Sequence, residues 1–178
     1  SLRLAYIESY DDALQHRGFQ YSWAGWDELT LWPTDDEYIF IQSRLRSAAG
    51  VPTRIVATTN PGGPGHVWVM KRFFIDENPS GMKPHHTYLD VKNNKAFEDP
   101  KLDRVKEADL PDGVKRKTRI FIPGRLSDNA FLDTDGEYRA RLLSMPEAQR
   151  KMLLEGRWDV VEGAFFEEWN PGVHVLKG

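Results

Sequence analysis

The sequence contains no cysteine in its 178 residues. This excludes disulfide bonds and thiolate metal sites, and it is compatible with a reducing cytoplasm. No apolar run approaches the roughly 20 residues that a membrane-spanning helix requires, so we expect no membrane partner. The first residues, SLRLAYIESY, lack the basic region and apolar stretch of a signal peptide.

An overall basic charge is also missing. The net charge is −3, so a nucleic-acid partner would need a local basic patch. The dense candidate is Lys115–Arg119, which is either a nucleic-acid contact or the solvated edge of a strand. A hydrophobic fraction of 40% is enough for a core, and the length fits one domain or one domain plus part of another.

The most informative stretch is Phe19–Leu31, FQYSWAGWDELTL. Its apolar and aromatic residues up to Trp26 predict a buried strand. Asp27 and Glu28 then follow at the carboxyl end of that strand, where ligands bind in open α/β sheets. Such a pair suits a hydrated Mg²⁺ beside phosphates. The alternative is that the two carboxylates cap a following helix.

A second buried strand is predicted at Thr53–Thr59, TRIVATT. Between the two strands we expect a helix that begins with a capping box at Thr34 and Glu37 and runs to about Ala49, with Gly50 as its stop. Its sheet-facing residues would be Tyr38, Ile41, Leu45 and Ala48. A connecting helix makes the two strands parallel.

Polar residues also end the second strand: Thr58, Thr59 and Asn60. Parallel neighbouring strands would present them at the same sheet edge as Asp27 and Glu28, which strengthens the site hypothesis. Thr58 could instead only pack in its strand, and Asn60 could only start the turn before the PGGPG run.

The remaining pattern is coarser. His66 is interpreted as a helix-start or packing residue rather than a metal ligand. We further expect strands at Leu2–Ile7, Thr87–Val91 and Thr118–Ile122, a turn or short helix at Glu8–Gln15, a helix at His66–Phe74, a long loop at Asn93–Gly113, helices with capping boxes at Thr134–Leu143 and Ser144–Glu155, and short strands at 163–166 and 173–176.

Several segments together resemble the large subunits of phage terminases, the motors that package DNA into procapsids. GFQYSWAGWDELT resembles the Walker B segment of that family, and Ser43–Arg46 matches its SRLR. VATTNPGGPGHVW resembles the coupling segment. FIPGRLSDNAFL and LLEGRWDVVEGAFF resemble the stretches that close the ATPase domain and open the nuclease domain.

The resemblance implies an α/β fold: the parallel sheet and flanking helices of an additional-strand (ASCE) P-loop NTPase, followed by a short segment leading into an RNase H-like nuclease domain. Residues 1–156 would belong to the ATPase and 157–178 to the nuclease. Asp27 would hold the Mg²⁺ of bound ATP through water, and Glu28 would be the catalytic residue that orients the attacking water. Thr59 and Asn60, with Thr58 beside them, would sense the γ-phosphate.

The same resemblance implies the partners. These would be double-stranded DNA, the portal protein and the small terminase subunit, with a homo-oligomeric ring during packaging and a location in the cytoplasm of the host. There is no G-x-x-x-x-G-K-[ST] phosphate loop in the sequence. We therefore expect a fragment whose phosphate cradle and nuclease carboxylates lie outside it, and which hydrolyses no ATP alone.

Two other functions remain open. A non-catalytic module of the same fold could bind DNA or portal protein through Lys115–Arg119 and the loop Asn93–Gly113. A metal nuclease could use Asp27 and Glu28, although it would need further carboxylates nearby, and Asp35 and Asp36 are expected at a helix start.

Overall fold

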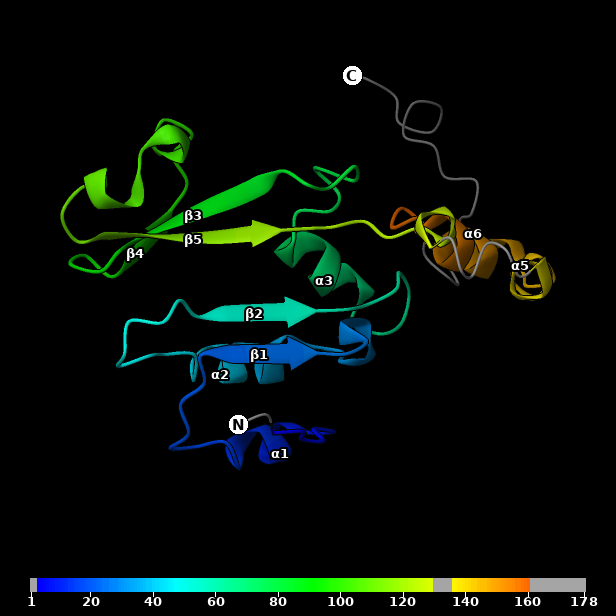
Figure 1. The fold of residues 1–178 in the computed structure, drawn as a ribbon, viewed down its shortest axis with the longest axis horizontal. Coiled ribbons are helices and arrows are strands. Elements are labelled where there is room, and N and C mark those ends of the chain that lie inside the picture. Colours follow the sequence, from blue (N-terminus) through cyan, green and yellow to red (C-terminus); the bar gives the residue numbers. More distant parts are fainter. Residues whose placement is uncertain (1–2, 130–135, 161–178) are drawn as a thin grey trace, which may run out of the picture.

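The computed structural model describes residues 3–129 and 136–160. This part of the chain is a mixed α/β structure with two separate sheets (Figure 1). Its helices are α1 (Tyr10–Leu14), α2 (Asp36–Gln42), α3 (His66–Arg72), α5 (Gly136–Leu143) and α6 (Glu147–Glu155). Its strands are β1 (Trp23–Trp26), β2 (Arg54–Ala57), β3 (Pro84–Asp90), β4 (Lys95–Phe97) and β5 (Val114–Ile120).

The first sheet is the predicted parallel pair. Strand β1 runs parallel to β2, with Trp23 opposite Arg54 and Trp26 opposite Ala57. Both strands are shorter than expected. The amino-terminal half of the predicted first strand contributes an isolated bridge from Tyr21 to Leu45 instead. The parallel direction was therefore predicted correctly, and the strand lengths were not.

Helix α2 ends seven residues before the expected Ala49. Tyr38 and Ile41 are buried as predicted, but Ala48 is exposed. The prediction failed because Tyr21 competes for the backbone: its N–H donates to the carbonyl of Arg44 (3.0 Å), and its carbonyl accepts from the N–H of Arg46 (2.9 Å). These bonds place the SRLR segment beside Tyr21 in an isolated parallel bridge, outside the helix.

The predicted capping boxes did not form in the described residues. At α2 the N-cap residue is Asp35, without a side-chain cap bond, and the Thr34 hydroxyl donates to the Asp36 carboxylate instead (2.9 Å). At α6 the N-cap residue is Pro146, and the Ser144 hydroxyl donates to the Arg141 carbonyl (2.7 Å). Each hydroxyl bonds a carbonyl or carboxylate that is close in sequence, so it does not accept from the amide groups at the start of the helix. The cap expected at Thr134 lies outside the described residues.

The second sheet is antiparallel, in the order β4-β3-β5. Strand β4 falls inside the segment that was predicted to be a loop, Asn93–Gly113. Three residues are too few for the alternation of side chains that identifies a strand in a sequence. The hairpin depends on Asp90, whose carboxylate accepts from the N–H groups of Lys92 and Asn93 (3.0 Å each). Strand β5 begins four residues earlier than expected, so the basic run lies within it.

The ends of the chain also required corrections. Residues 3–7 form no strand, whereas the short helix expected next is present as α1 with a reciprocal capping box between Ser9 and Asp12. Helix α3 matches its prediction closely. Gly156 ends α6 in the left-handed region (φ 64°), as expected. The strands expected at 163–166 and 173–176 lie outside the described residues.

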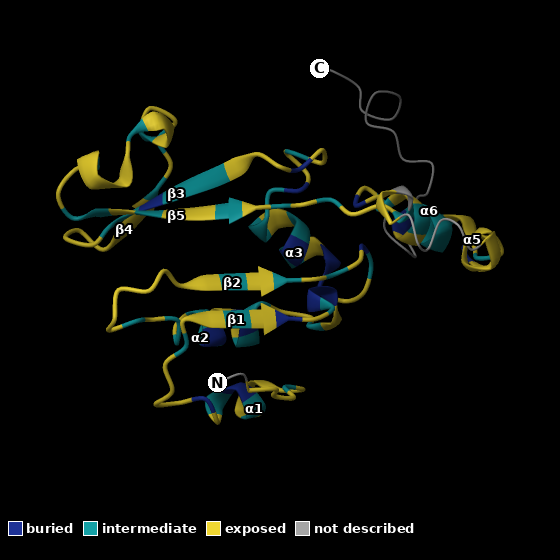
Figure 2. Ribbon diagram, viewed as in Figure 1, coloured by how far each residue is buried: buried dark blue, intermediate teal, exposed yellow. Residues whose placement is uncertain are grey.

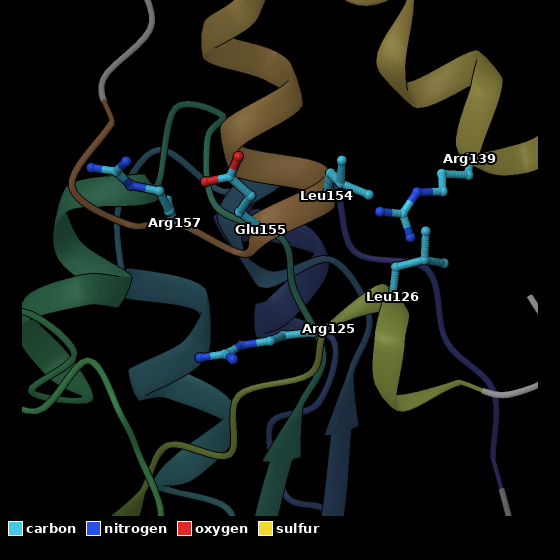
Figure 3. A pocket seen from close by; sticks show the side chains of 6 residues that line it. All are labelled: Arg125, Leu126, Arg139, Leu154, Glu155 and Arg157. Atoms are coloured by element: carbon cyan, nitrogen blue, oxygen red, sulfur yellow. The ribbon is translucent and has the colours of Figure 1, made fainter. Parts of the chain in front are cut away.

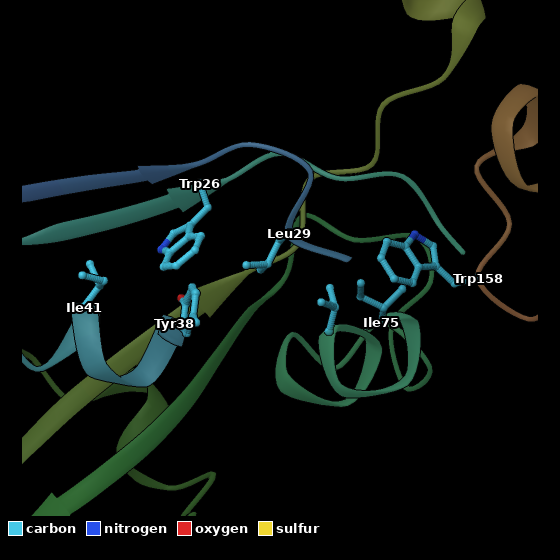
Figure 4. Packing of buried hydrophobic residues seen from close by; sticks show 7 residues of the cluster. Trp26, Leu29, Tyr38, Ile41, Ile75 and Trp158 are labelled. Atoms are coloured by element: carbon cyan, nitrogen blue, oxygen red, sulfur yellow. The ribbon is translucent and has the colours of Figure 1, made fainter. Parts of the chain in front are cut away.

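One hydrophobic cluster joins most of these elements. It lies where α2 and α3 meet the first sheet, and the buried segments gather there (Figures 2 and 4). Its last member, Trp158, follows α6. The buried members of the cluster are Trp26, Leu29, Tyr38, Ile41, Val69, Ile75 and Trp158.

The described helices are short, and none has the length and apolar character needed to cross a lipid bilayer.

Candidate functional site

The candidate site lies just beyond the carboxyl ends of β1 and β2. Backbone hydrogen bonds continue past both strands: Thr58 N–H donates to the Trp26 carbonyl (2.9 Å), and Leu29 N–H donates to the Thr58 carbonyl (3.0 Å). These bonds hold the segment after β1 beside the segment after β2. The acidic pair and the polar strand end therefore lie together, as the sequence predicted.

Two side-chain hydrogen bonds join the segments. The Thr58 hydroxyl donates to Asp27 Oδ1 (2.6 Å), and Asn60 Nδ2 donates to Glu28 Oε1 (3.2 Å). Thr58, Asp27 and Asn60 are exposed, and Glu28 is half-buried. Each carboxylate thus has one neutral partner and keeps acceptor capacity toward solvent. Thr58 and Asn60 therefore bond the two carboxylates, in addition to any part they have in packing or in the turn.

Glu28 has an unusual backbone. Its φ and ψ are 51° and 55°, in the left-handed region that residues with a Cβ rarely adopt. Such a conformation costs about 1–2 kcal/mol. Residues held this way cluster at functional sites, where the surrounding structure imposes the conformation. Here the bond from Leu29 to Thr58 supplies that constraint on the next peptide.

The capping alternative gains no support. Glu28 occupies the N-cap position of the 3-10 turn Leu29–Leu31, but its side chain makes no cap bond there. The carboxylates of Asp27 and Glu28 instead accept from residues that follow β2.

Thr59 behaves differently from its neighbours. Its hydroxyl accepts from the Thr30 N–H (3.0 Å) and donates to Thr30 Oγ1 (2.8 Å), and Thr30 Oγ1 donates in turn to the Asn60 carbonyl (3.1 Å). Thr59 is therefore bonded within the protein, and it is not joined to the two carboxylates. Thr30 was missed by the sequence analysis. Its signal was weak: one polar residue between two leucines, which is buried in the structure.

The loop after β2 is anchored through His66. This residue starts α3 and is buried, as predicted. Its Nδ1 accepts from the Gly62 N–H (2.8 Å), so Nε2 carries the proton and donates to the Trp158 carbonyl (2.9 Å). The loop that follows the polar strand end is thereby tied to the segment after α6.

The residues fit a magnesium ion that also has phosphate and water ligands. Mg²⁺ is usually held through one or two carboxylates together with substrate phosphates, and Asp27 and Glu28 can supply that number. Among the residues described, no group of three or more histidine, cysteine or carboxylate side chains lies close enough to hold a metal. Asp35 binds Arg72 (3.0 Å), so it does not extend the acidic pair, and the metal-nuclease alternative gains no support.

The basic run is divided between two environments. Arg116 lies over the Tyr88 ring and donates to the Leu102 and Val105 carbonyls, and Arg119 donates to the Thr87 hydroxyl (3.1 Å). Burial lowers the pKa of Arg119. Lys115 and Lys117 are exposed. Arg116 and Arg119 therefore bond groups within the protein, and only Lys115 and Lys117 among the basic side chains of the run are exposed to a partner.

Comparisons of this chain with models of known protein families, with characterised proteins and with solved structures found no match.

Proposed function

We propose that this chain carries the water-activating half of an ATPase site in the large subunit of a phage terminase. In this proposal the parallel pair β1–β2 belongs to a P-loop NTPase sheet of the additional-strand type. The observation that carries it is the cross-strand pairing of Asp27 with Thr58 and of Glu28 with Asn60. What further supports it is the ordered set of family-like segments along the sequence.

Each side chain has a defined task in this proposal. Mg²⁺, when bound, would supply positive charge at the phosphates, and Asp27 would hold it through water. Glu28 would accept a hydrogen bond from the attacking water and orient it. Asn60 would donate to Glu28 in one state and to the terminal phosphate in another, because a neutral amide can exchange partners without repelling an anion.

The sequence has no phosphate-loop motif, so the proposal requires a cradle from residues outside it. The partners follow from the proposed family: double-stranded DNA, portal protein and small terminase subunit. A homo-oligomeric ring, a location in the host cytoplasm and a nuclease domain that begins at residue 157 are part of the same proposal.

The deciding experiment replaces Glu28 by Gln in the intact protein and measures ATP hydrolysis and ATP binding separately. We expect hydrolysis to fall by on the order of 100-fold or more while binding is kept, because a neutral amide orients and polarises the attacking water much less well than a carboxylate does. Glu107→Gln is a matched control, since that glutamate is exposed on the 3-10 turn Glu107–Asp109.

Unchanged hydrolysis in the Glu28→Gln protein would contradict the proposal and favour the non-catalytic DNA- or portal-binding module. The 178-residue chain alone should show no Mg²⁺-dependent ATP turnover. Measured turnover by that chain would contradict the requirement for an external phosphate cradle.

A further inference from the structure

Thr30 is a buried polar residue two positions after Glu28. It is only 4% exposed, and its backbone and side chain both bond the segment that follows β2. Its carbonyl accepts from the Gly65 N–H (2.8 Å), in addition to the three bonds that join it to Thr59 and Asn60. Four hydrogen bonds therefore converge on a residue to which the proposed hydrolysis gives no task.

The two hydroxyl groups of this network set each other's direction. The Thr59 hydroxyl accepts from the Thr30 N–H and donates to Thr30 Oγ1, and the Thr30 hydroxyl donates to the Asn60 carbonyl. A hydroxyl has a single proton to donate, so this order uses both protons. The loop also wraps closely around Thr30, since a Cβ at Gly63 would lie 2.9 Å from the Thr30 carbonyl oxygen. The Asn60 carbonyl is thus held from the buried side.

The network closes on the candidate site from two sides. On one side, Glu28 precedes the 3-10 turn that contains Thr30, and the Leu31 N–H donates to the Glu28 carbonyl (2.9 Å). On the other side, Thr30 bonds the carbonyl of Asn60, whose side-chain amide reaches Glu28 (3.2 Å). Pro61 further restricts the backbone of Asn60. The position of the Asn60 amide relative to the Glu28 carboxylate therefore depends on Thr30.

The bond from Asn60 to Glu28 needs such support because it is open to solvent. Asn60 is exposed and Glu28 is half-buried. Water competes for an exposed hydrogen bond, so the bond by itself holds the amide weakly. The buried hydroxyl of Thr30 meets no such competition, and it fixes the same residue at its carbonyl.

Figure 3 shows a different region, a hollow between the segment after β5 and the last two helices. Its lining residues are Arg125, Leu126, Arg139, Leu154, Glu155 and Arg157. The four charged side chains among them are exposed, and Arg157 is paired with Asp159 (Nε to Oδ1, 2.9 Å). The lining includes neither Thr30 nor a residue that Thr30 bonds, so a substitution at Thr30 leaves it intact.

We propose that Thr30 and Thr59 are positioning residues for ATP hydrolysis, an inference that rests on the proposed function. Their paired hydroxyls hold the Asn60 peptide, so that the Asn60 amide donates to Glu28 while Glu28 orients the attacking water. In this arrangement neither hydroxyl contacts the phosphates or the attacking water. Thr59 thus differs from the γ-phosphate sensor that the resemblance implied, and Asn60 keeps that task.

The test compares Thr30→Val, which nearly keeps the shape of threonine but lacks the hydroxyl, with Thr30→Ser, which keeps the hydroxyl. ATP hydrolysis by the intact protein is measured over a range of ATP concentrations. We expect kcat to fall about tenfold in Thr30→Val with KM for ATP unchanged, because a hydrogen bond that positions Asn60 is lost. Thr30→Ser should keep most of the activity. Thr118→Val is the matched control, since that hydroxyl is bonded to His86 on the second sheet (2.9 Å).

A double variant separates positioning from a merely structural role. In an Asn60→Ala background, Thr30→Val should lower kcat no further, because its effect passes through the Asn60 amide. Additive losses overturn the inference, as does an equal loss in Thr30→Ser or in Thr118→Val. Thr59→Val applies the same test at the partner hydroxyl and keeps the inference testable if Thr30→Val does not fold.

The side-chain amide NMR signal of Asn60, identified by its loss in Asn60→Ala, tests the geometry without ATP. The signal should move in Thr30→Val and stay in place in Thr30→Ser. An unmoved signal in Thr30→Val overturns the inference even where Glu28→Gln abolishes hydrolysis as proposed. A moved signal together with unchanged hydrolysis in Glu28→Gln supports the hold of Thr30 on Asn60 and contradicts the proposed ATPase, so the two failures are distinguishable.

Discussion

At the scale of single residues, Glu28 combines a strained backbone with a side chain that reaches across to Asn60. The left-handed conformation is costly for any residue with a Cβ, and glycine alone adopts it without penalty. A stability measurement can separate this backbone cost from the contribution of the carboxylate.

We predict that Glu28→Gly is more stable than Glu28→Ala by about 1 kcal/mol, because both lose the carboxylate and only alanine keeps the Cβ. The measurement is urea unfolding of both variants. The order should reverse at Arg150, inside α6, where glycine costs about 1 kcal/mol relative to alanine. Equal stability at position 28 would mean that Glu28 is not strained.

His16 is the second residue with a distinct environment. It is only 7% exposed, its Nδ1 lies 2.7 Å from the Tyr21 hydroxyl, and Arg3 is the charged neighbour that acts on it. Burial, and secondarily the charge of Arg3, lower the pKa of His16. The folded chain therefore favours neutral imidazole.

This pKa shift predicts a pH dependence of stability. Because the folded-state pKa lies below the unfolded value of about 6.5, the unfolded chain binds the proton first as pH falls. The free energy of unfolding should thus decrease as pH falls below about 6.5, until the folded-state pKa is passed. Urea unfolding over this range should show a slope that is reduced in His16→Gln, and an unchanged slope would contradict the assignment.

At the scale of elements, the start of α3 packs unusually close to the turn after β1. Gly65 N–H donates to the Thr30 carbonyl (2.8 Å), and Trp68 Nε1 donates to the Trp32 carbonyl (2.7 Å). A Cβ at Gly65 would lie 2.2 Å from the Trp32 carbonyl oxygen. Glycine is required here because a Cβ has no room, and not because of the backbone conformation: φ is −89°, which any residue can adopt.

We predict that Gly65→Ala destabilises the fold by about 1–3 kcal/mol, because the helix must move away from the turn. The change should appear in urea unfolding and as a shift in tryptophan fluorescence. Gly124→Ala is the matched control, since a Cβ there meets no atom within 4 Å. Equal effects at the two positions would show that the close approach is not limiting.

At the scale of the whole molecule, His66 joins two segments that are 92 residues apart. It bonds the loop after β2 to the segment after α6, and its ring packs against Trp158 (centroids 5.1 Å apart). This contact connects the loop beside the candidate site to the segment after α6.

We predict that His66→Ala costs about 2–5 kcal/mol, because it leaves the half-buried Gly62 N–H and the buried Trp158 carbonyl without their partner. His66→Asn should recover part of the loss, since its amide can again accept from the Gly62 N–H. His86→Ala should cost far less, because that ring bonds an exposed Thr118 hydroxyl. A small effect at His66 would show that the two segments are held together by other contacts. Thermal or urea unfolding measures all three.

The first sheet is covered on one face only in the described residues. Parallel sheets are normally covered on both faces, yet Trp23 is 51% exposed on β1 and Val56 is 44% exposed on β2. The other face carries Trp26, which is buried in the core cluster. Within the described residues, the face that carries Trp23 and Val56 is therefore exposed and the opposite face packs on the core.

The sequence by itself determined the local periodic features. The apolar run ending at Trp26, the β-branched run before Thr58 and the helix at His66 all follow from side-chain patterns within a few residues. It also placed Asp27, Glu28, Thr58 and Asn60 at one edge, because a helix between two strands makes them parallel.

Only the tertiary structure decided what depends on residues distant in sequence. Tyr21 bonds the segment after α2, the Asp90 carboxylate bonds the turn before β4, and Thr30 bonds Thr59 within the fold. The physical reason is that hydrogen-bonding groups take whichever partner the packed fold offers, and local patterns contain no information about that partner.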